Sequence, residues 1–250
     1  MQNKTAESKA VAIGIKGGVN FPRMYYTDNP SVSQLPQDWY VTPMGGVFVD
    51  IPLGSVLTMS PEFVYLQRGT KLSYTHQSGA DVHYSISAHF VDFRLPFELR
   101  WPVNPYLQPY LVVGGEVGMP LGGQIHMDHI EPANFDQDID LSDANMNIVH
   151  AGAFAGLGIR SRIGLGSRDM VLKLSATWHQ GLLNNFSAAE QDGTATAINV
   201  NAYQPKGARL PQGLEVCLGI SFPLERQDDA CATFSKDRYR RHGGKGLFGF

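Results

Sequence analysis

Histidine and serine, the residue types of a general base and its nucleophile, recur in a few stretches of this sequence. Seven of the eight histidines belong to this set: His76, His83, His89, His126, His129, His150 and His179. Ser73, Ser85 and Ser87 are the candidate partners. No fixed spacing joins a serine to a histidine, so we expect no catalytic residue and no enzyme. A histidine metal site is an equally weak alternative.

Aspartates recur in a stretch, 124–159, that contains no Lys or Arg. Asp136, Asp138 and Asp140 have the spacing that opens a calcium-binding loop, but Leu141 stands where the sharp turn of that loop needs Gly. We therefore expect a solvated acidic loop here, with no metal ion and no other cofactor.

The C-terminal tail is basic and aromatic from Lys236 onward. Cations beside aromatic anchors favour a surface that binds an acidic protein partner. The alternative is a solvated tail, or one held weakly at an anionic membrane surface. Cys217 and Cys231 form no CxxC motif. Whether they form a disulfide that ties the tail to the rest of the chain is left open. The predicted partner-binding residues are Lys236, Arg238, Tyr239, Arg240, Arg241, Lys245, Phe248 and Phe250.

Alternation of apolar and polar residues, rather than helical periodicity, dominates the chain and predicts β-strands. In 91–101, VDFRLPFELRW, the apolar side chains share one face and the charged side chains share the other. The connections between the predicted strands are mostly short at one end and long at the other, which is the layout of an up-and-down membrane barrel. The eight predicted strands are 11–21, 43–52, 56–75, 83–101, 108–125, 147–164, 169–181 and 208–222.

Length and charge narrow the classes of protein. The chain has 250 residues, 43% of them hydrophobic, and a net charge of -3. The absence of an apolar run near 18 residues excludes transmembrane helices, but strands that alternate can still cross a membrane. A near-neutral chain lacks the basic field that phosphate binding needs, so we expect no nucleic-acid partner.

Charged residues on the polar faces of the predicted strands are balanced, with six basic and six acidic side chains. A membrane barrel turns its polar faces inward, and an unpaired charge in a narrow interior is costly. We therefore predict a charge network in the lumen, and the alternative is a soluble protein with these charges on its surface. The network residues are Lys16, Asp50, Glu62, Arg68, Asp92, Arg94, Glu98, Arg100, Glu116, Arg160, Lys173 and Glu215.

Aromatic residues near the predicted strand ends suggest the two girdles of a membrane barrel. An interior of eight strands is filled by side chains, so we expect no open pore. The short-turn end has Trp101, Tyr106, Tyr110 and Phe222, and the long-loop end has Tyr74, Tyr84, Trp178 and Phe186.

Glycine-rich strand motifs follow one another along the chain: GIKGGVN at 14–20, SPEFVYLQRGTKLSY at 60–74, VDFRLPFELRW at 91–101, PYLVVGGEVGMPL at 109–121, HAGAFAGLGIR at 150–160, LKLSATWHQGLLN at 172–184 and LGISF at 218–222. In this order they resemble the PorT-like family of outer-membrane beta-barrel proteins from Bacteroidota, which is similar in outline to the small OmpA-type barrels. The resemblance implies an eight-stranded barrel in the outer membrane and a signal peptide absent from this chain. Some members of that family take part in type IX secretion and gliding, and the resemblance implies no catalytic residue.

Together, these observations predict an all-β protein with an eight-stranded antiparallel transmembrane barrel over 11–222. Residues 1–10 are the expected N-terminal periplasmic segment and 223–250 the periplasmic tail. We expect a structural or interaction subunit with no open pore, an accessory component of an outer-membrane secretion or assembly complex. Its expected partners are outer-membrane lipid and other protein subunits, bound through the tail and the extracellular loops. The alternatives are a lipid-modifying enzyme of the outer membrane and a soluble ligand-binding barrel.

Overall fold

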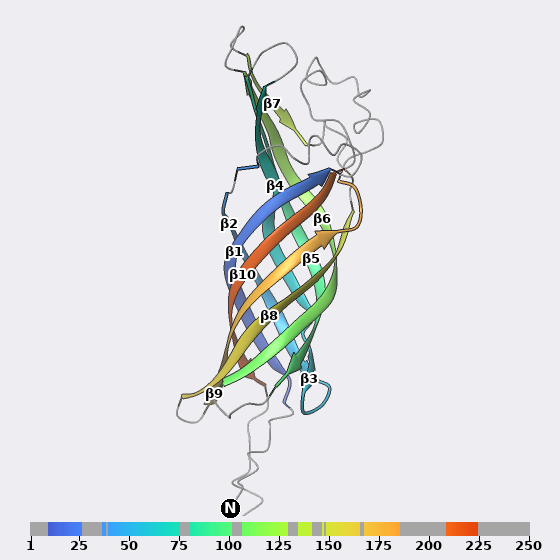
Figure 1. Ribbon diagram of the computed structural model, residues 1–250. Coiled ribbons are helices and arrows are strands. Elements are labelled where there is room, and N and C mark those ends of the chain that lie inside the picture. The colour runs from blue at the N-terminus through green and yellow to red at the C-terminus, as the bar shows by residue number, and fades with distance from the viewer. Residues whose placement is uncertain are drawn as a thin grey trace, which may run out of the picture.

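The computed structural model describes residues 10–26, 37–38, 40–75, 81–101, 107–129, 135–141, 147, 149–165, 168–185 and 209–224. Within these residues no helix is long and apolar enough to cross a membrane. Ten strands form one antiparallel sheet (Figure 1). Their bounds are β1 Ala12–Tyr26, β2 Thr42–Pro52, β3 Leu57–Met59, β4 Glu62–Thr75, β5 Asp81–Arg100, β6 Leu107–His129, β7 Phe135–Asp140, β8 His150–Leu165, β9 Arg168–Gly181 and β10 Arg209–Pro223.

Nine of these strands close into a ring. Around the ring, β1 pairs with β2, β4 with β5, β5 with β6, β6 with β8, β8 with β9 and β9 with β10, and the pairing of β10 with β1 completes the circle. Strands β3 and β4 share one position between β2 and β5, where Pro61, which has no N–H to donate, helps to separate them. Eight positions therefore surround the axis, and the predicted antiparallel barrel is confirmed, with one strand broken into two.

The tenth strand, β7, lies in the stretch that was predicted to be a solvated acidic loop, and it corrects that prediction. Its residues pair with the upper part of β6, from Asp140 opposite Gln124 to Phe135 opposite His129. The aspartates that favoured a loop lie on this strand, where Asp138 and Asp140 are exposed. A strand with one face in water accepts charged side chains, and that is why the composition misled.

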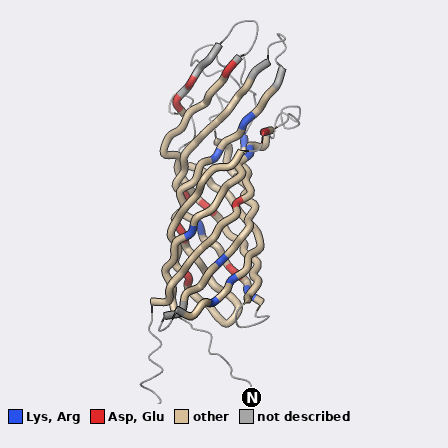
Figure 2. The backbone as a smooth tube through the Cα atoms, turned by 90° about the vertical axis from the view of Figure 1, so that its left-hand side faces the viewer, with Lys and Arg blue, Asp and Glu red and all other residues tan. Residues whose placement is uncertain are grey.

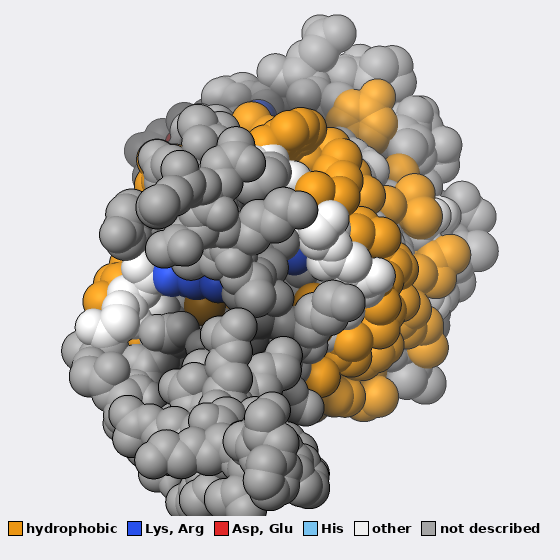
Figure 3. Space-filling model, turned by 90° about the horizontal axis from the view of Figure 1, so that it is seen from below, with side chains coloured by type: hydrophobic (Ala, Val, Ile, Leu, Met, Phe, Trp, Pro, Cys, Tyr) orange, Lys and Arg blue, Asp and Glu red, His pale blue; other side chains and the backbone are white. Residues whose placement is uncertain are grey.

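The wall of the ring is apolar on the outside. Ile15 and Leu157 are each 64% exposed, and Leu174 is 51% exposed, although all three lie in regular strands. Figure 3 shows hydrophobic side chains over the part of the wall in view. With charged residues buried within the ring, this is the arrangement of a barrel surrounded by lipid.

The predicted aromatic girdles hold only in part. Trp101 and Phe222 at the short-turn end, and Trp178 toward the long-loop end, face outward and are exposed. Tyr110 and Tyr84 are instead buried, so their assignment to a girdle is wrong. Alternation places both of them on the inward faces of their strands. Tyr106 and Phe186 lie outside the described residues, as does the side chain of Tyr74.

Strands β4, β5, β6 and β7 continue above the ring at the long-loop end (Figure 1), and we name this part the extension. In the extension the inward-facing side chains are apolar and the outward-facing side chains are polar, which is the reverse of the ring. On β5 the buried face changes from charged, at Asp92 and Arg94, to apolar, at Ile86 and Phe90, while His83 on the opposite face is exposed. The extension is thus built as a soluble sheet above a membrane-spanning ring.

A bulge on β6 accompanies this change. The β5–β6 register shifts between His89 and Phe90, and the two glycines Gly122 and Gly123 have φ angles of 141° and 154°. A Cβ at Gly123 would overlap the carbonyl oxygen of Ser87, so only glycine fits there. Past the bulge β6 turns other residues inward and supplies the apolar core of the extension.

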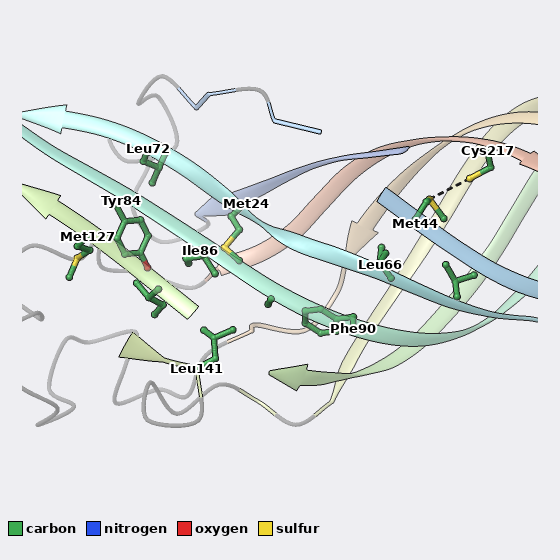
Figure 4. Packing of buried hydrophobic residues seen from close by; sticks show 13 residues of the cluster. Met24, Met44, Leu66, Leu72, Tyr84, Ile86, Phe90, Met127, Leu141 and Cys217 are labelled. Atoms are coloured by element: carbon green, nitrogen blue, oxygen red, sulfur yellow. Dashed lines mark hydrogen bonds between the residues drawn. The ribbon is translucent and has the colours of Figure 1, made fainter. Parts of the chain in front are cut away.

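That core is a continuous cluster of buried side chains. Figure 4 shows them between the strands, from the extension down into the ring. Because the cluster fills the upper lumen, it separates the charged interior from the long-loop end. Its members are Met24, Met44, Val64, Leu66, Leu72, Tyr84, Ile86, Ala88, Phe90, Ile125, Met127, Leu141 and Cys217.

Candidate functional site

The candidate site is the charged interior of the ring, below the apolar cluster. Each side chain reaches it from an inward-facing strand position, because alternate residues of a strand point to the same face. Of the twelve residues predicted from the sequence, eleven are buried, and the side chain of Lys16 keeps 14% of its surface exposed. The buried eleven are Asp50, Glu62, Arg68, Asp92, Arg94, Glu98, Arg100, Glu116, Arg160, Lys173 and Glu215.

The middle of the lumen holds five of these side chains in one ionic cluster. Arg94 binds Glu215 through both terminal nitrogens, at 2.7 and 2.8 Å, and its Nε lies 3.1 Å from Glu116. Arg68 donates to Glu116 at 2.9 Å and to Asp92 at 2.5 Å. Asp92 also accepts from Arg94 at 3.1 Å. The cluster joins β4, β5, β6 and β10 across the lumen.

Two of the candidate histidines named from the sequence, His150 and His179, belong to the same cluster. His179 Nδ1 lies 2.8 Å from Glu116 and its Nε2 lies 3.2 Å from Glu215. His150 Nε2 lies 3.1 Å from Glu116. The strand alternation could have predicted this position for His179. It lies six residues after Lys173 on β9, so both side chains are on the same face of the strand. Glu116 is the centre, with four basic groups around it.

A second cluster lies closer to the short-turn end. Lys173 Nζ lies 2.6 Å from both Asp50 and Glu98. Ser60 Oγ donates to Asp50 at 2.6 Å and Ser221 Oγ at 3.3 Å. This cluster is formed from β2, β5, β9, β10 and the break between β3 and β4. Because it joins opposite walls, it fixes the lower lumen as the first cluster fixes the middle.

The remaining four predicted residues lie apart from these two groups. Lys16 and Glu62 form a separate pair at 2.6 Å. Arg100 and Arg160 are buried at the short-turn end. Among the described residues, Arg160 forms no ion pair, although it interacts electrostatically with Asp50 at longer range. The sequence predicted each of these charges, but not which of them would meet.

A cavity of about 50 Å³ lies between the clusters. Its walls include Lys16, Phe48, Arg94, Lys173 and His179. A space of this size holds ordered water rather than an aqueous channel. With the apolar cluster above it, the described part of the lumen is closed.

The arrangement supports a structural role for these charges. Buried ion pairs persist where geometry and hydrogen bonds satisfy both partners, and removing one partner leaves a charge stranded in a medium of low dielectric. In the described part of the chain, no group of three or more His, Cys, Asp or Glu residues is placed to hold a metal ion. The ion pairs that cross the lumen form an ionic lock between the walls of the ring.

The other predicted residues are scattered. Ser73 Oγ lies 2.9 Å from His83 Nδ1, and His126 Nδ1 lies 2.8 Å from Asp138, both on the exposed face of the extension. The thiol of Cys217 is buried 3.4 Å from the sulfur of Met44, and Cys231 lies outside the described residues. The same holds for the eight predicted partner-binding residues of the tail, between 236 and 250.

A match to a known family supports the same architecture. A family model described as "Outer membrane protein beta-barrel domain" matches residues 2–187. Similar solved structures include Ail, the attachment invasion locus protein of Yersinia pestis, at 10% identity and a TM-score of 0.33, with 86% of this chain and 98% of that chain covered. Another is the outer membrane protein OprG of Pseudomonas aeruginosa, at 10% identity and a TM-score of 0.34, with 86% and 96% covered. A search among curated proteins found no match.

Proposed function

Because the chain belongs to the family defined by the outer membrane protein beta-barrel domain, we propose that it serves in the outer membrane as a structural or interaction subunit without an open pore. The finer proposal is an accessory component of a protein secretion or assembly complex. The PorT-like resemblance motivates this choice.

One observation carries the proposal: the lumen is filled. The ionic clusters around Glu116 and Lys173 join the walls, and buried apolar side chains such as Phe90 fill the space above them. A barrel that is filled in this way leaves no channel through which solutes could diffuse. We therefore expect partners to be bound by the parts of the protein outside the membrane.

Two such parts are available. Short turns of outer-membrane barrels face the periplasm, so both chain termini are assigned to that side and the extension to the cell exterior. The exposed face of the extension has Asp138 and Asp140 on β7 and Lys71 on β4. On the periplasmic side, the tail after Leu224 supplies cations and aromatic residues that fit an acidic partner.

The test is a pull-down from mild-detergent extracts of membranes, with bound proteins identified by mass spectrometry. Three forms are compared: the intact chain, a chain truncated after Leu224, and the double variant Asp138→Asn with Asp140→Asn. Partners that disappear only with the truncation are bound through the tail. Partners that disappear only with the double variant are bound through the extension.

Each form is first checked for a folded barrel by its resistance to protease in the detergent extract. Lys71→Gln is the matched control for the double variant, because it changes charge on the same face of the extension at a different strand. If all forms leave the membrane without a partner, the proposal of an interaction subunit is wrong.

A second candidate, a lipid-modifying enzyme, gains one specific observation. Ser73 is hydrogen bonded to His83, and His83 lies opposite Asp128 in the β5–β6 register, so serine, histidine and aspartate follow one another across three strands. However, Ser73 lies eight residues along β4 from Tyr65, which is exposed on the wall, or roughly 26 Å at the usual rise per residue. We therefore expect the pair to lie above the lipid, which counts against the enzyme.

The enzyme hypothesis is tested with vesicles of outer-membrane lipid incubated with the purified protein. Lipid hydrolysis that is abolished by Ser73→Ala would establish the enzyme. His89→Ala serves as the matched control, because His89 is hydrogen bonded to Tyr65 and not to a serine. We expect no hydrolysis by any of these forms.

A further inference from the structure

Arg160 is a buried cation in an unusual position. It lies on the inward face of β8 near the short-turn end, and only 8% of its surface is exposed. Its Nε makes no hydrogen bond, and among the described residues no carboxylate pairs with its guanidinium. Burying a charge without a partner is costly, so such a site is suited to a group that supplies the opposite charge.

The strand register makes this position less favourable still. Arg160 lies directly opposite Lys173 in the β8–β9 pairing, and both side chains point into the lumen. Like charges that face each other across strands are destabilising. Lys173 is already bound to Asp50 and Glu98, at 2.6 Å each. Those two carboxylates are therefore committed to the lysine, and Arg160 is left over.

The described charges of the lower layer agree. Its buried carboxylates are those of Asp50 and Glu98, and Lys173 binds both of them. Among the described residues, neither carboxylate is therefore left to pair with Arg160. Figure 2 shows Lys and Arg positions gathered toward this end of the ring.

Arg160 lies near the periplasmic opening, five residues before the end of β8 at Leu165. Arg162, two residues further along β8 toward that opening and on the same face of the strand, is half-buried. Gln108, the register partner of Arg160 on β6, is buried and has a side-chain amide that can donate a hydrogen bond. In Figure 3, which views the molecule from below, basic side chains are visible inside the opening of the ring.

We propose that the periplasmic mouth of the barrel is a binding site for an oxyanion, a carboxylate or a phosphate group, with Arg160 as the principal ligand. A guanidinium presents two parallel N–H groups that match the two oxygens of such an anion. Gln108 adds a neutral donor, and Arg100 adds positive charge from the adjacent wall. The bound anion would neutralise Arg160 and screen it from Lys173. This site does not depend on the proposed function.

Two sources can provide the oxyanion: a group from outside the chain, or a carboxylate of this chain beyond Leu224. The experiment separates them. The intact protein and the form truncated after Leu224 are labelled with 15N-arginine in detergent micelles and titrated with inorganic phosphate at constant ionic strength. The side-chain Nε–H signal of Arg160 is assigned by its loss in Arg160→Gln.

We expect this signal to shift with phosphate and to reach saturation. Saturation in both forms identifies an external anion as the ligand, whereas saturation only in the truncated form identifies a carboxylate beyond Leu224. Measured by isothermal titration calorimetry, which does not need the Arg160 signal, phosphate binding by Arg160→Gln should be at least tenfold weaker than by the natural protein. Lys71→Gln, which removes a cation at the opposite end, should bind as the natural protein does.

Two results would overturn the proposal. One is the absence of a saturable shift of the Arg160 signal in both the intact and the truncated form. The other is equal phosphate affinity of Arg160→Gln and the natural protein. The first result needs no variant, so the proposal stays testable even if Arg160→Gln does not fold.

Discussion

His179 Nδ1 lies 2.8 Å from a carboxylate oxygen of Glu116, and both side chains are almost completely buried. The other ring nitrogen of this histidine faces Glu215 at 3.2 Å. Nε2 also lies 3.0 Å from the Thr177 hydroxyl. We infer that the ring donates to both carboxylates, which requires a proton on each nitrogen and makes the ring a cation. Asp92, Glu116 and Glu215 then face three cations, since Arg68 and Arg94 supply the other two.

This relationship predicts that His179→Gln destabilises the barrel. The change removes a cation between two buried carboxylates, and breaking such a pair costs about 3–5 kcal/mol. The free energy of unfolding is measured by urea titration of the protein folded into lipid vesicles. His89→Gln is the control, because His89 lies on the outer face beside Tyr65, and we expect a change of less than about 1 kcal/mol there. Equal losses in the two variants would contradict the cationic role of His179.

A second prediction contrasts the two basic residues of the lower lumen. Lys173→Met leaves Asp50 and Glu98 buried without their cation, so its loss should also be about 3–5 kcal/mol. Arg160→Met removes the cation that lacks a carboxylate, together with its repulsion from Lys173.

We therefore expect Arg160→Met to be neutral or stabilising in the same urea titration, in the absence of added phosphate. The two variants are matched, because they replace opposite residues of one strand pair by the same side chain. A loss of unfolding free energy for Arg160→Met as large as that for Lys173→Met would show that Arg160 is paired after all.

The strands were predictable because the alternation in segments such as 91–101 depends only on neighbouring residues. The change from charged to apolar side chains on the buried face of β5 was present in the sequence too, at Ile86 and Phe90. The prediction of a single strand over 83–101 is confirmed by β5. The contacts were not predictable. Arg94 and Glu215 are 121 residues apart in the chain, and their meeting depends on which strands oppose each other across the lumen. Strand β7 was not predicted from the sequence, because its aspartates are typical of a loop.

A third prediction locates the upper boundary of the membrane. Val117 faces outward on the ring and is 54% exposed, so Val117→Arg places a charge against lipid and should cost about 2–4 kcal/mol. Ser85 faces outward on the extension, which we assign to water, so Ser85→Arg should leave stability almost unchanged. Both variants are compared by urea unfolding from lipid vesicles. A similar penalty for Ser85→Arg would mean that the bilayer also covers the extension.

A fourth prediction concerns Gly69 on β4, which has a φ angle of 154° and lies against the carbonyl oxygen of Ile86. A Cβ at this position would overlap that oxygen, so Gly69→Ala must separate β4 from β5 locally at a cost of about 1–3 kcal/mol. Amide hydrogen exchange should accelerate at Thr70 and Ser87 but not in the ring below. Gly54→Ala is the control, because a Cβ there meets no atom within 4 Å. Unchanged exchange in the extension would refute this account.

The last prediction is that the barrel does not conduct ions, even when its ionic lock is weakened. Arg94 is bound to Asp92, Glu116 and Glu215, so Arg94→Ala dissolves the cluster in the middle of the lumen. The apolar side chains above that cluster remain in place. We therefore expect no steady current across planar bilayers from either the natural protein or Arg94→Ala, measured beside a general porin as a positive control. Steady channels in the natural protein would overturn the closed lumen, whereas channels only in Arg94→Ala would show that the apolar cluster is no seal and that the ionic cluster alone closes the barrel.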